Sequence, residues 1–251
     1  MLRGAEGWSR LELARYLASG AYSRLTGGGV NQREVDLKLS GFDVRVQTFS
    51  SQLGSYADIF FLDEYEKVPG FESQPGQTVV DAGANVGFFT LRHARDVGPS
   101  GRVFAFEPNP SVFRLLQHNV ERNGLKQVSC HRSALGERVG SLLFTSDPRS
   151  TSCGHISESE ETGEPVPVST LDALVEEQGL TCIDLLKLDV EGYEPHVLRG
   201  GAQRALACTR RVVMESHLTR DIAWDILRPL GFRKAYDGFN PNVVYFTREL
   251  G

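Results

Sequence analysis

Short apolar runs alternate with segments of helical period over residues 78–247, and this alternation limits the fold more than any other feature of the sequence. The runs that predict strands are TVVDA, RVFAFE, VSCHR, SLLFT, IDLLKLDV, RRVVMES, FRKAY and VVYFT. Strands that alternate with helices form β-α-β units, whose parallel strands make one sheet covered by helices on both faces. The sequence therefore predicts an α/β fold with a mostly parallel sheet.

Several of the intervening helices have recognisable ends. Asn109 is expected to cap a helix over residues 110–124, which begins with proline and ends with glycine. STLD has the form of a capping box, so Ser169 is expected to begin a second helix that ends at residue 179. A third helix is expected over residues 219–229. The last two apolar runs flank DGFNP, a hairpin-like connection, so the final strand should run antiparallel.

Residues 1–70 follow a different pattern and are expected to form a small cap. WSRLELARYLASG has the period of a short amphipathic helix, and residues 35–49 alternate as a hairpin around Ser40 and Gly41. YADIFFLDEY is expected to be a further helix. This section has too few apolar residues to hold a fold of its own, so we expect it to pack on a main domain over residues 71–251.

Composition argues against several classes of function. The chain has 40% hydrophobic and 24% charged residues, as in ordinary globular proteins, and a net charge of −5 gives no basic footprint for nucleic acid. We find no apolar run that would span a membrane and no secretory signal, so we expect a cytoplasmic protein. The four cysteines are scattered, without metal-ligand spacing, and are expected to be reduced thiols.

The stretch TVVDAGANVGFF predicts a strand, a turn made of small residues and the start of a helix. Such a turn lets a ligand approach the backbone, and the amides at the helix start offer hydrogen-bond donors. A dinucleotide fingerprint that starts at Gly83 would need glycine at positions 85 and 88, which hold Asn85 and Phe88. The missing glycines favour a nucleoside ligand without phosphates, and S-adenosylmethionine is the obvious one.

Glu107 ends the next apolar run, twenty residues after Gly87. A carboxylate at the tip of the second strand is suited to accept hydrogen bonds from both hydroxyls of a ribose. The alternative role is a cap for the following helix, although Asn109 is better placed for that. We therefore expect Glu107 to bind the ribose.

Four motifs carry a resemblance to a known family: VVDAGANVGFFT, FAFEPNP, SALGE and LLKLDVEGYEPHVLRGG. In this order they resemble the FkbM family of methyltransferases, which use S-adenosylmethionine and mostly methylate hydroxyl groups. The resemblance covers about residues 78–217. It implies a class I methyltransferase fold, with a seven-stranded sheet that has one antiparallel strand near its edge.

The same resemblance implies which residues hold the cofactor. Asp81, Gly83, Asn85 and Gly87 are implied at its methionine end, Glu107 at the ribose, and Ser133 with Ala134 at the adenine. The segment DIFFLDEY resembles one that precedes the core in such proteins and brings Glu64 or Tyr65 over the cofactor. The acceptor would be a small molecule, a sugar or another natural product.

A base is needed near the methyl group if the acceptor is a hydroxyl. In KLDVEGYE, Lys187 and Asp189 share one face of a strand, so both side chains are expected to approach the cleft. They would serve either as a buried ion pair or, for Asp189, as a catalytic or cofactor-binding carboxylate. Glu191 is expected to order the turn that follows.

His217 is the second candidate base, at the end of the next strand with Glu215 beside it. A histidine that caps the helix after it is an equal alternative, and His155 is a weaker rival. A divalent metal held by Asp189, Glu191 and Glu215 is conceivable, but no spacing demands one.

Residues 145–167 have no regular pattern and are expected to form a loop, either a solvated connection or a lid over the acceptor.

Other classes of function stay open at this stage. An oxidoreductase would explain the turn and Glu107 but needs the missing glycines. A protein with this fold could also bind S-adenosylmethionine without turnover, or methylate nitrogen. A turnover assay separates these possibilities.

Overall fold

The computed structural model describes residues 34–47, 52–147, 150–157, 163–216, 218–235 and 240–249, without the side chains of residues 53 and 146–157. The helix predicted at residues 8–20 and the candidate base His217 lie outside the described residues, as does the side chain of His155.

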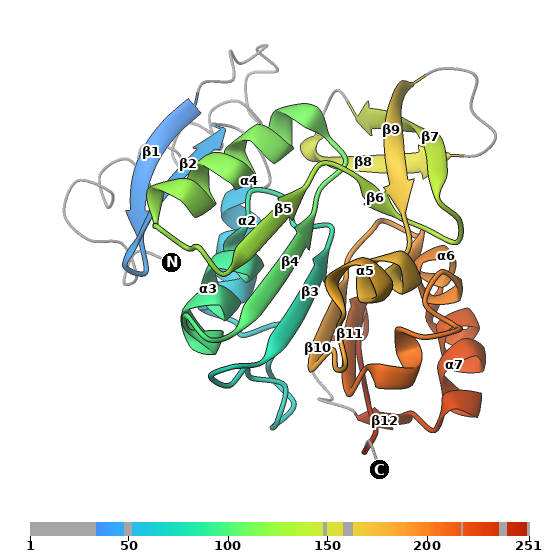
Figure 1. Cartoon of the computed structure of the whole chain (residues 1–251). Helices are drawn as coiled ribbons and strands as arrows, with labels where there is room; N and C mark the ends of the chain where they lie inside the picture. Colours follow the sequence, from blue (N-terminus) through green and yellow to red (C-terminus); the bar gives the residue numbers. More distant parts are fainter. Residues whose placement is uncertain are drawn as a thin grey trace.

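A seven-stranded sheet forms the centre of the molecule, in the order β12-β13-β11-β10-β3-β4-β5 (Figure 1). Its strands in chain order are β3 (Thr78–Ala82), β4 (Arg102–Phe106), β5 (Val128–His131), β10 (Leu185–Leu188), β11 (Arg211–Glu215), β12 (Arg233–Ala235) and β13 (Val243–Thr247). Strands β5, β4, β3, β10 and β11 are parallel, whereas β13 is antiparallel to both of its neighbours. The predicted α/β fold and the antiparallel strand near the edge are confirmed.

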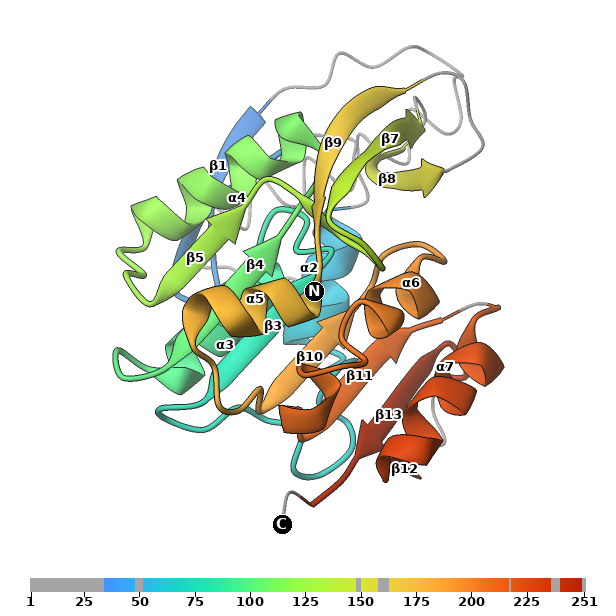
Figure 2. The same cartoon turned by 45° about the vertical axis from the view of Figure 1, so that its right-hand side comes forward.

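Helices cover both faces of this sheet, as the second view shows (Figure 2). One face carries α2 (Gln52–Phe60), α3 (Phe88–Val97) and α4 (Pro110–Arg122), and the other carries α5 (Leu171–Gln178), α6 (Glu194–Arg199) and α7 (Arg220–Leu227). Short 3₁₀ turns follow at η2 (Leu206–Cys208) and η3 (Arg228–Leu230). Successive strand residues point to opposite faces, so Val79 packs in the first core and Val80 in the second.

The helix ends agree with the sequence at α4 and differ by one residue at α5. The Asn109 side chain accepts hydrogen bonds from the amides of Ser111 and Val112, as expected of a cap. The cap of α5 is Thr170, which accepts from the amide of Ala173, so the prediction of Ser169 is wrong. Ser169 is still paired in a strand, and the helix therefore begins one residue later.

A hairpin of β1 (Glu34–Leu39) and β2 (Phe42–Gln47) packs against α4. Two asparagine side chains of α4 bond the backbone of β2: Asn119 accepts from the amide of Arg45 at 2.6 Å, and Asn123 accepts from the amide of Asp43 at 3.0 Å. The expected hairpin is confirmed. The helix expected over residues 56–65 ends at Phe60, and turns follow to residue 65.

A second sheet of four strands lies beside the carboxyl ends of β4 and β5 (Figures 1 and 2). Its strands in chain order are β6 (Ala134–Leu135), β7 (Gly140–Asp147), β8 (Ser150–Ser157) and β9 (Glu164–Ser169). The prediction of a patternless loop over residues 145–167 is therefore wrong, because the end of β7, all of β8 and most of β9 lie within this segment. SLLFT is a strand as expected, but it belongs to this second sheet.

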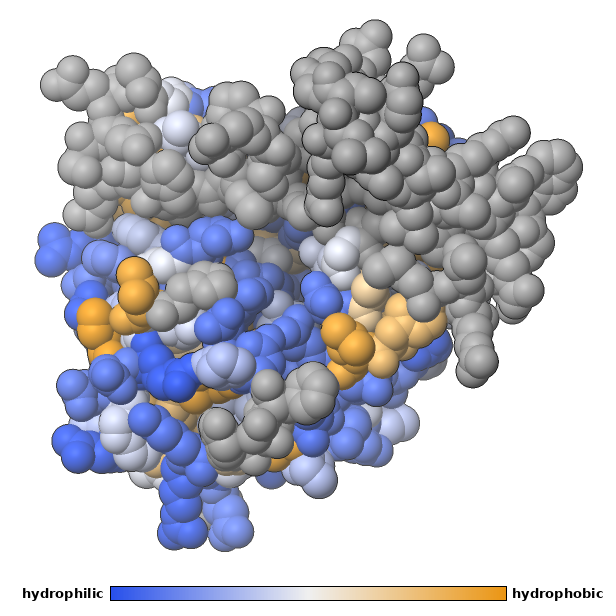
Figure 3. Space-filling model, turned by 180° about the vertical axis from the view of Figure 1, so that it is seen from behind, coloured by the Kyte–Doolittle hydropathy of each residue, from blue (hydrophilic) through white to orange (hydrophobic). Residues whose placement is uncertain are grey.

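The face opposite to that of Figure 1 is mostly hydrophilic where the structure describes it, with small separate hydrophobic patches (Figure 3). Among the described residues, the large hydrophobic side chains that are exposed belong to Leu62, Val139, Leu218 and Ile222. No helix in the described ranges has the length and apolar character needed to cross a membrane. Cys130, Cys182 and Cys208 are free thiols, as expected.

Candidate functional site

The turn after β3 has the close-packed backbone that its small residues predict. Gly83, Asn85 and Gly87 have positive φ angles of 80°, 52° and 97°, and Gly87 caps α3. A Cβ atom on Gly83 would lie 1.9 Å from the carbonyl oxygen of Asp189. Only glycine fits this position, because it needs both a left-handed backbone and room for a neighbouring main chain.

A cavity of about 170 Å³ opens beside this turn, at the carboxyl ends of β3, β10 and β11. It lies at the edge of an open α/β sheet where such folds bind their ligands. Its lining residues are Ser55, Asp58, Ile59, Glu64, Tyr65, Gly83, Ala84, Asn85, Phe88, Phe89, Lys187, Asp189 and Glu215. Of the residues predicted from the sequence, the structure therefore brings together Glu64, Tyr65, Gly83, Asn85, Lys187, Asp189 and Glu215.

Lys187 is a buried residue that lines the cavity. Its ammonium nitrogen lies 3.2 Å from Asp81 Oδ1 and 3.4 Å from Asp189 Oδ2, and it donates to the carbonyl oxygen of Gly83 at 2.8 Å. Burial lowers the pKa of Lys187, but the two carboxylates raise it by a larger amount, so the pKa lies above its usual value. The predicted shared face of Lys187 and Asp189 is confirmed, and Lys187 ties both aspartates to the glycine turn.

Tyr65 links two carboxylates across the cavity. Its hydroxyl lies within hydrogen-bond reach of Asp189 Oδ2 at 3.1 Å and Glu215 Oε2 at 3.3 Å. Burial, with both carboxylates adding to it, raises the pKa of Tyr65 well above its usual range, so the phenol stays protonated and can donate. Burial together with the charges of Asp189 and Glu64 raises the pKa of Glu215 to about 7.

Glu64 lies on the same side of the cavity as Tyr65. The Asn240 side-chain amide donates to its carboxylate, and the Tyr245 hydroxyl donates to its backbone carbonyl. Burial raises the pKa of Glu64, and the nearby Asp58 raises it further. These contacts fasten the turn after α2 to the last strands of the main sheet.

Glu107 is buried at the tip of β4, where both of its carboxylate oxygens bond the backbone. Oε2 accepts from the amide of Asn85 at 3.0 Å, and Oε1 accepts from the amide of Asn109 at 2.9 Å. Burial raises its pKa to about 7, although these two amides oppose the shift. Each oxygen keeps a lone pair, so the carboxylate can still accept from a hydroxyl.

Five of the predicted cofactor residues do not line the cavity: Glu107 and the four that follow. Asp81 is fully buried beneath Lys187 and accepts from the Thr90 hydroxyl at 2.6 Å. Gly87 packs against Leu116, where an added Cβ would come within 2.8 Å. Ser133 and Ala134 lie at the start of the second sheet, beyond the tip of β5.

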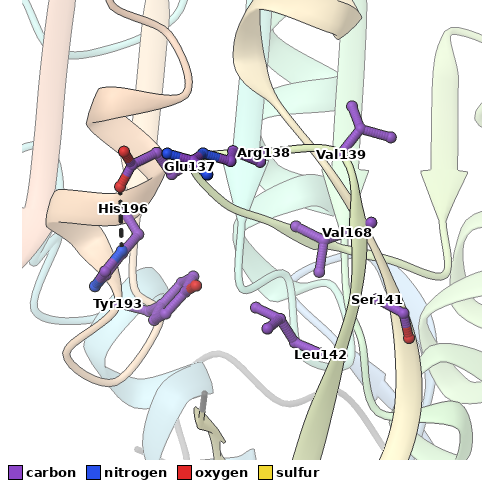
Figure 4. A pocket seen from close by; sticks show the side chains of 9 residues that line it. Glu137, Arg138, Val139, Ser141, Leu142, Val168, Tyr193 and His196 are labelled. Atoms are coloured by element: carbon purple, nitrogen blue, oxygen red, sulfur yellow. Dashed lines mark ion pairs between the residues drawn. The ribbon is translucent and has the colours of Figure 1, made fainter.

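A second, larger cavity of about 380 Å³ lies between α6 and the second sheet (Figure 4). The rings of Tyr193, at the N-terminal cap of α6, and His196, within α6, are stacked with their centroids 4.2 Å apart. His196 Nδ1 lies 3.6 Å from a carboxylate oxygen of Glu137. The turn over residues 190–192 separates this cavity from Asp189 along the chain. Sequence reasoning did not point to it, because its walls come from segments that meet only in the fold.

Comparisons with known proteins agree with the motifs. Residues 81–240 match the model of the methyltransferase FkbM domain. Methyltransferase 1 of Beauveria bassiana is 32% identical over 161 residues, a match that covers 56% of this chain and 64% of that protein. The 31-O-demethyl-FK506 methyltransferase FkbM of Streptomyces tacrolimicus is 30% identical over 179 residues, with 59% and 68% covered.

A solved structure shows the same fold. The crystal structure of the methyltransferase FkbM from Methylobacillus flagellatus matches with a TM-score of 0.51 at 17% identity, over 77% of this chain and 48% of that one. The chain thus spans less than two thirds of the Beauveria protein and about half of the crystallised one. Because the family model covers well over half of the sequence, this chain belongs to the FkbM methyltransferase family.

Proposed function

We propose that this protein transfers a methyl group from S-adenosylmethionine to a hydroxyl group of a small molecule or a glycoside. The observation that carries the proposal is the glycine turn joined to Glu107 through the amide of Asn85, at the carboxyl edge of the sheet. This arrangement places a turn that begins and ends with glycine beside a carboxylate. The relative from Streptomyces, whose name describes a substrate that lacks a methyl group on oxygen, supports the choice of a hydroxyl acceptor.

The residues of the turn fit a nucleoside cofactor. Gly83 and Asn85 line the cavity at the end proposed for the methionine group, and Glu64 and Asp189 line the same cavity. Glu107 is proposed to accept hydrogen bonds from the ribose hydroxyls, and Ser133 with Ala134 to lie against the adenine. Asp81 and Gly87 would act beneath this surface, Asp81 through Lys187 and Gly87 by beginning α3.

Asp189 is proposed as the base of the reaction. When bound, S-adenosylmethionine supplies a methyl group on a positively charged sulfur that is a good leaving group. The carboxylate of Asp189 lies in the cavity with about a third of its side chain exposed (30%), so a hydroxyl can reach it. Asp189 would accept the hydroxyl proton and release it to water, while Tyr65 and Lys187 hold the carboxylate in place. His217 is the alternative base.

Calorimetry with S-adenosylhomocysteine and with NAD tests the choice of cofactor. We expect binding of S-adenosylhomocysteine and no binding of NAD. Glu107→Ala should weaken the affinity by on the order of 1.5–3 kcal/mol, because it removes a charged acceptor. Glu177→Ala, on the exposed side of α5, is the matched control and should bind like the parent. Tight NAD binding without a response to S-adenosylhomocysteine would exclude the methyltransferase proposal.

Two substitutions test the choice of base. Asp189→Asn and His217→Gln keep the shape of each side chain but remove its ability to accept a proton. Loss of a general base typically slows turnover by about 10² to 10⁴. Methylated products in a cell extract, detected by mass spectrometry, give both the acceptor and the rate. If Asp189→Asn turns over at the parental rate and His217→Gln does not, the role belongs to His217.

A further inference from the structure

The hydroxyl of Tyr65 lies between two carboxylates that line the cavity. It is 3.1 Å from Asp189 Oδ2 and 3.3 Å from Glu215 Oε2, so a single phenol proton faces two acceptors. Asp189 follows β10, and Glu215 ends β11, the neighbouring parallel strand. The structure therefore contains a continuous hydrogen-bonded path from the proposed base, through the phenol, to a second carboxylate.

A phenol in this position can pass a proton on without changing its own charge. A tyrosine hydroxyl both donates and accepts hydrogen bonds. When Asp189 carries a proton on Oδ2, it can donate that proton to the phenol oxygen while the phenol gives its own proton to Oε2 of Glu215. No phenolate forms in this transfer, which suits the site because burial and both carboxylates raise the pKa of Tyr65 well above its usual range.

The charges around the two carboxylates give the transfer a direction. Lys187 Nζ lies 3.4 Å from Asp189 Oδ2, so the ammonium group stabilises the negative charge on this carboxylate. Burial raises the pKa of Glu215 to about 7, and the charges of Asp189 and Glu64 add to the shift. We therefore expect a proton taken up by Asp189 to move on to Glu215. The titratable and charged groups that face Glu215 are Glu64, Tyr65, Lys187, Asp189 and Glu191.

Glu215 is also held by contacts that do not involve Tyr65. The amide of the next residue, Ser216, donates to the carbonyl oxygen of Asn242 at 2.7 Å. The hydroxyl of Ser216 accepts from the amide of Thr219 at 3.1 Å. These contacts fix the end of β11, so replacement of Tyr65 by phenylalanine should remove the path and leave Glu215 in place.

We propose that Glu215 is a second catalytic carboxylate, which receives the proton of the acceptor from Asp189 through the hydroxyl of Tyr65. The inference rests on the proposed function and deepens it, because it gives the proton a route out of the cavity. The methyl carbon exchanges its bond to sulfur for a bond to the acceptor oxygen, sulfur keeps the electron pair, and the O–H bond of the acceptor breaks. The proton passes to Asp189 and then to Glu215, which is half-buried and releases it to water.

The pH dependence of turnover tests this path. In the parent, the rate should fall by about tenfold for each pH unit below 7 and approach that of Glu215→Gln, because a protonated Glu215 cannot receive the proton. Glu215→Gln should be slower than the parent above pH 7 by about 10- to 100-fold, without a change of rate around that pH. Turnover is measured as the S-adenosylhomocysteine formed with the small-molecule fraction of a cell extract.

Two comparisons assign the pH dependence to Glu215. The alternative base, His217, is present in the parent and in Glu215→Gln, so a dependence that disappears in this variant does not come from that histidine. Glu177→Gln, on the exposed side of α5, is the matched control and should keep both the rate and the pH dependence of the parent. A fall in rate below pH 7 that persists in Glu215→Gln would overturn the proposal.

Tyr65→Phe separates a proton path from positioning alone. Phenylalanine keeps the ring that packs edge-on against Phe89, at 5.6 Å between centroids, and removes only the hydroxyl. The variant should be about as slow as Glu215→Gln and lose the same pH dependence, and the double variant should be no slower than either single one. If Tyr65 only held Asp189 in place, the rate would fall equally at every pH and the dependence below pH 7 would remain.

NMR of the unliganded protein measures the contact itself. The resonance of the Tyr65 ring carbon that carries the hydroxyl, assigned with Tyr65→Phe, should shift with a midpoint near pH 7 in the parent and not in Glu215→Gln. A constant resonance in the parent would overturn the proposal without any assay of activity. A parent that shows the shift but neither binds nor forms S-adenosylhomocysteine would instead contradict the proposed function, and with it the reaction that the path serves.

Discussion

Gly83→Ala tests the tightest backbone contact of the candidate site. The φ angle of Gly83 is +80°, which costs an alanine about 1–2 kcal/mol. The added Cβ would also lie 1.9 Å from the carbonyl oxygen of Asp189 and 2.9 Å from its carbonyl carbon. Both atoms belong to main chain and have no rotamer by which to move away, so we expect a further ~1–3 kcal/mol of strain. The free energy of unfolding should fall by about 2–5 kcal/mol in total.

Gly124→Ala separates the two contributions. Gly124 also has a positive φ, +65°, but an added Cβ there meets nothing within 4 Å. It should therefore lose only the ~1–2 kcal/mol of the backbone term. Urea denaturation measures both variants, provided that the slope of the transition stays that of the parent.

Gly83→Ala should also disturb the candidate site. Displacement of the Asp189 main chain moves its carboxylate away from Tyr65 and Lys187, so Gly83→Ala should bind S-adenosylhomocysteine more weakly at a temperature where it is folded. Gly124→Ala should bind like the parent. Equal losses of stability in the two variants would refute the reasoning, because they would show that the main chain at Asp189 gives way freely.

Three further predictions concern charge and the second sheet. The pKa of Glu107 rises from 4.5 to about 7 on folding, so its contribution to stability is present below pH 4.5 and is lost as the pH rises through 7. At ~1.4 kcal/mol per unit of pKa, this contribution to the free energy of unfolding amounts to about 3 kcal/mol. Urea titrations at several pH values should show this pH dependence in the parent and not in Glu107→Gln. Lys187→Met leaves the carboxylate of Asp81 buried without its cation, so calorimetric unfolding should show a loss of about 3–5 kcal/mol. If residues 145–167 gate the acceptor, shortening the β7–β8 hairpin should change turnover while the affinity for S-adenosylhomocysteine stays the same; a fall in that affinity would contradict this role.

The sequence predicted the main sheet because five of its strands, β3, β4, β10, β11 and β13, are mostly apolar runs that are buried on both faces. Strand β8 has no such signal, because STSCGHIS has neither an apolar run nor a regular alternation. Its pairing with β7 is determined by tertiary contacts. The helix expected to reach residue 65 fails for a related reason. Its last five residues are held by contacts to α3 and to the last strands, which override their helical pattern.

The sequence predicted those parts of the candidate site whose residues lie within a single motif. Gly83, Asn85 and Asp189 come from such motifs, and the shared face of Lys187 and Asp189 follows from the strand period. The contact of Lys187 with Asp81 depends on β10 lying next to β3 in register, which no single stretch of sequence displays. The hydrogen bond between Ser73 and His93 is harder still to foresee, because the loop before β3 and helix α3 meet only in the folded protein.

The asparagine contacts between α4 and the N-terminal hairpin affect how the protein unfolds. Asn119 is fully buried and also donates to the carbonyl oxygen of Val86 in the glycine turn, so one side chain joins β2, α4 and the start of α3. The first hydrophobic core likewise runs without interruption from Leu37 and Val44 to the central strands. The hairpin therefore has no separate opening transition, and its amide at Arg45 should exchange with deuterium only when the whole domain unfolds.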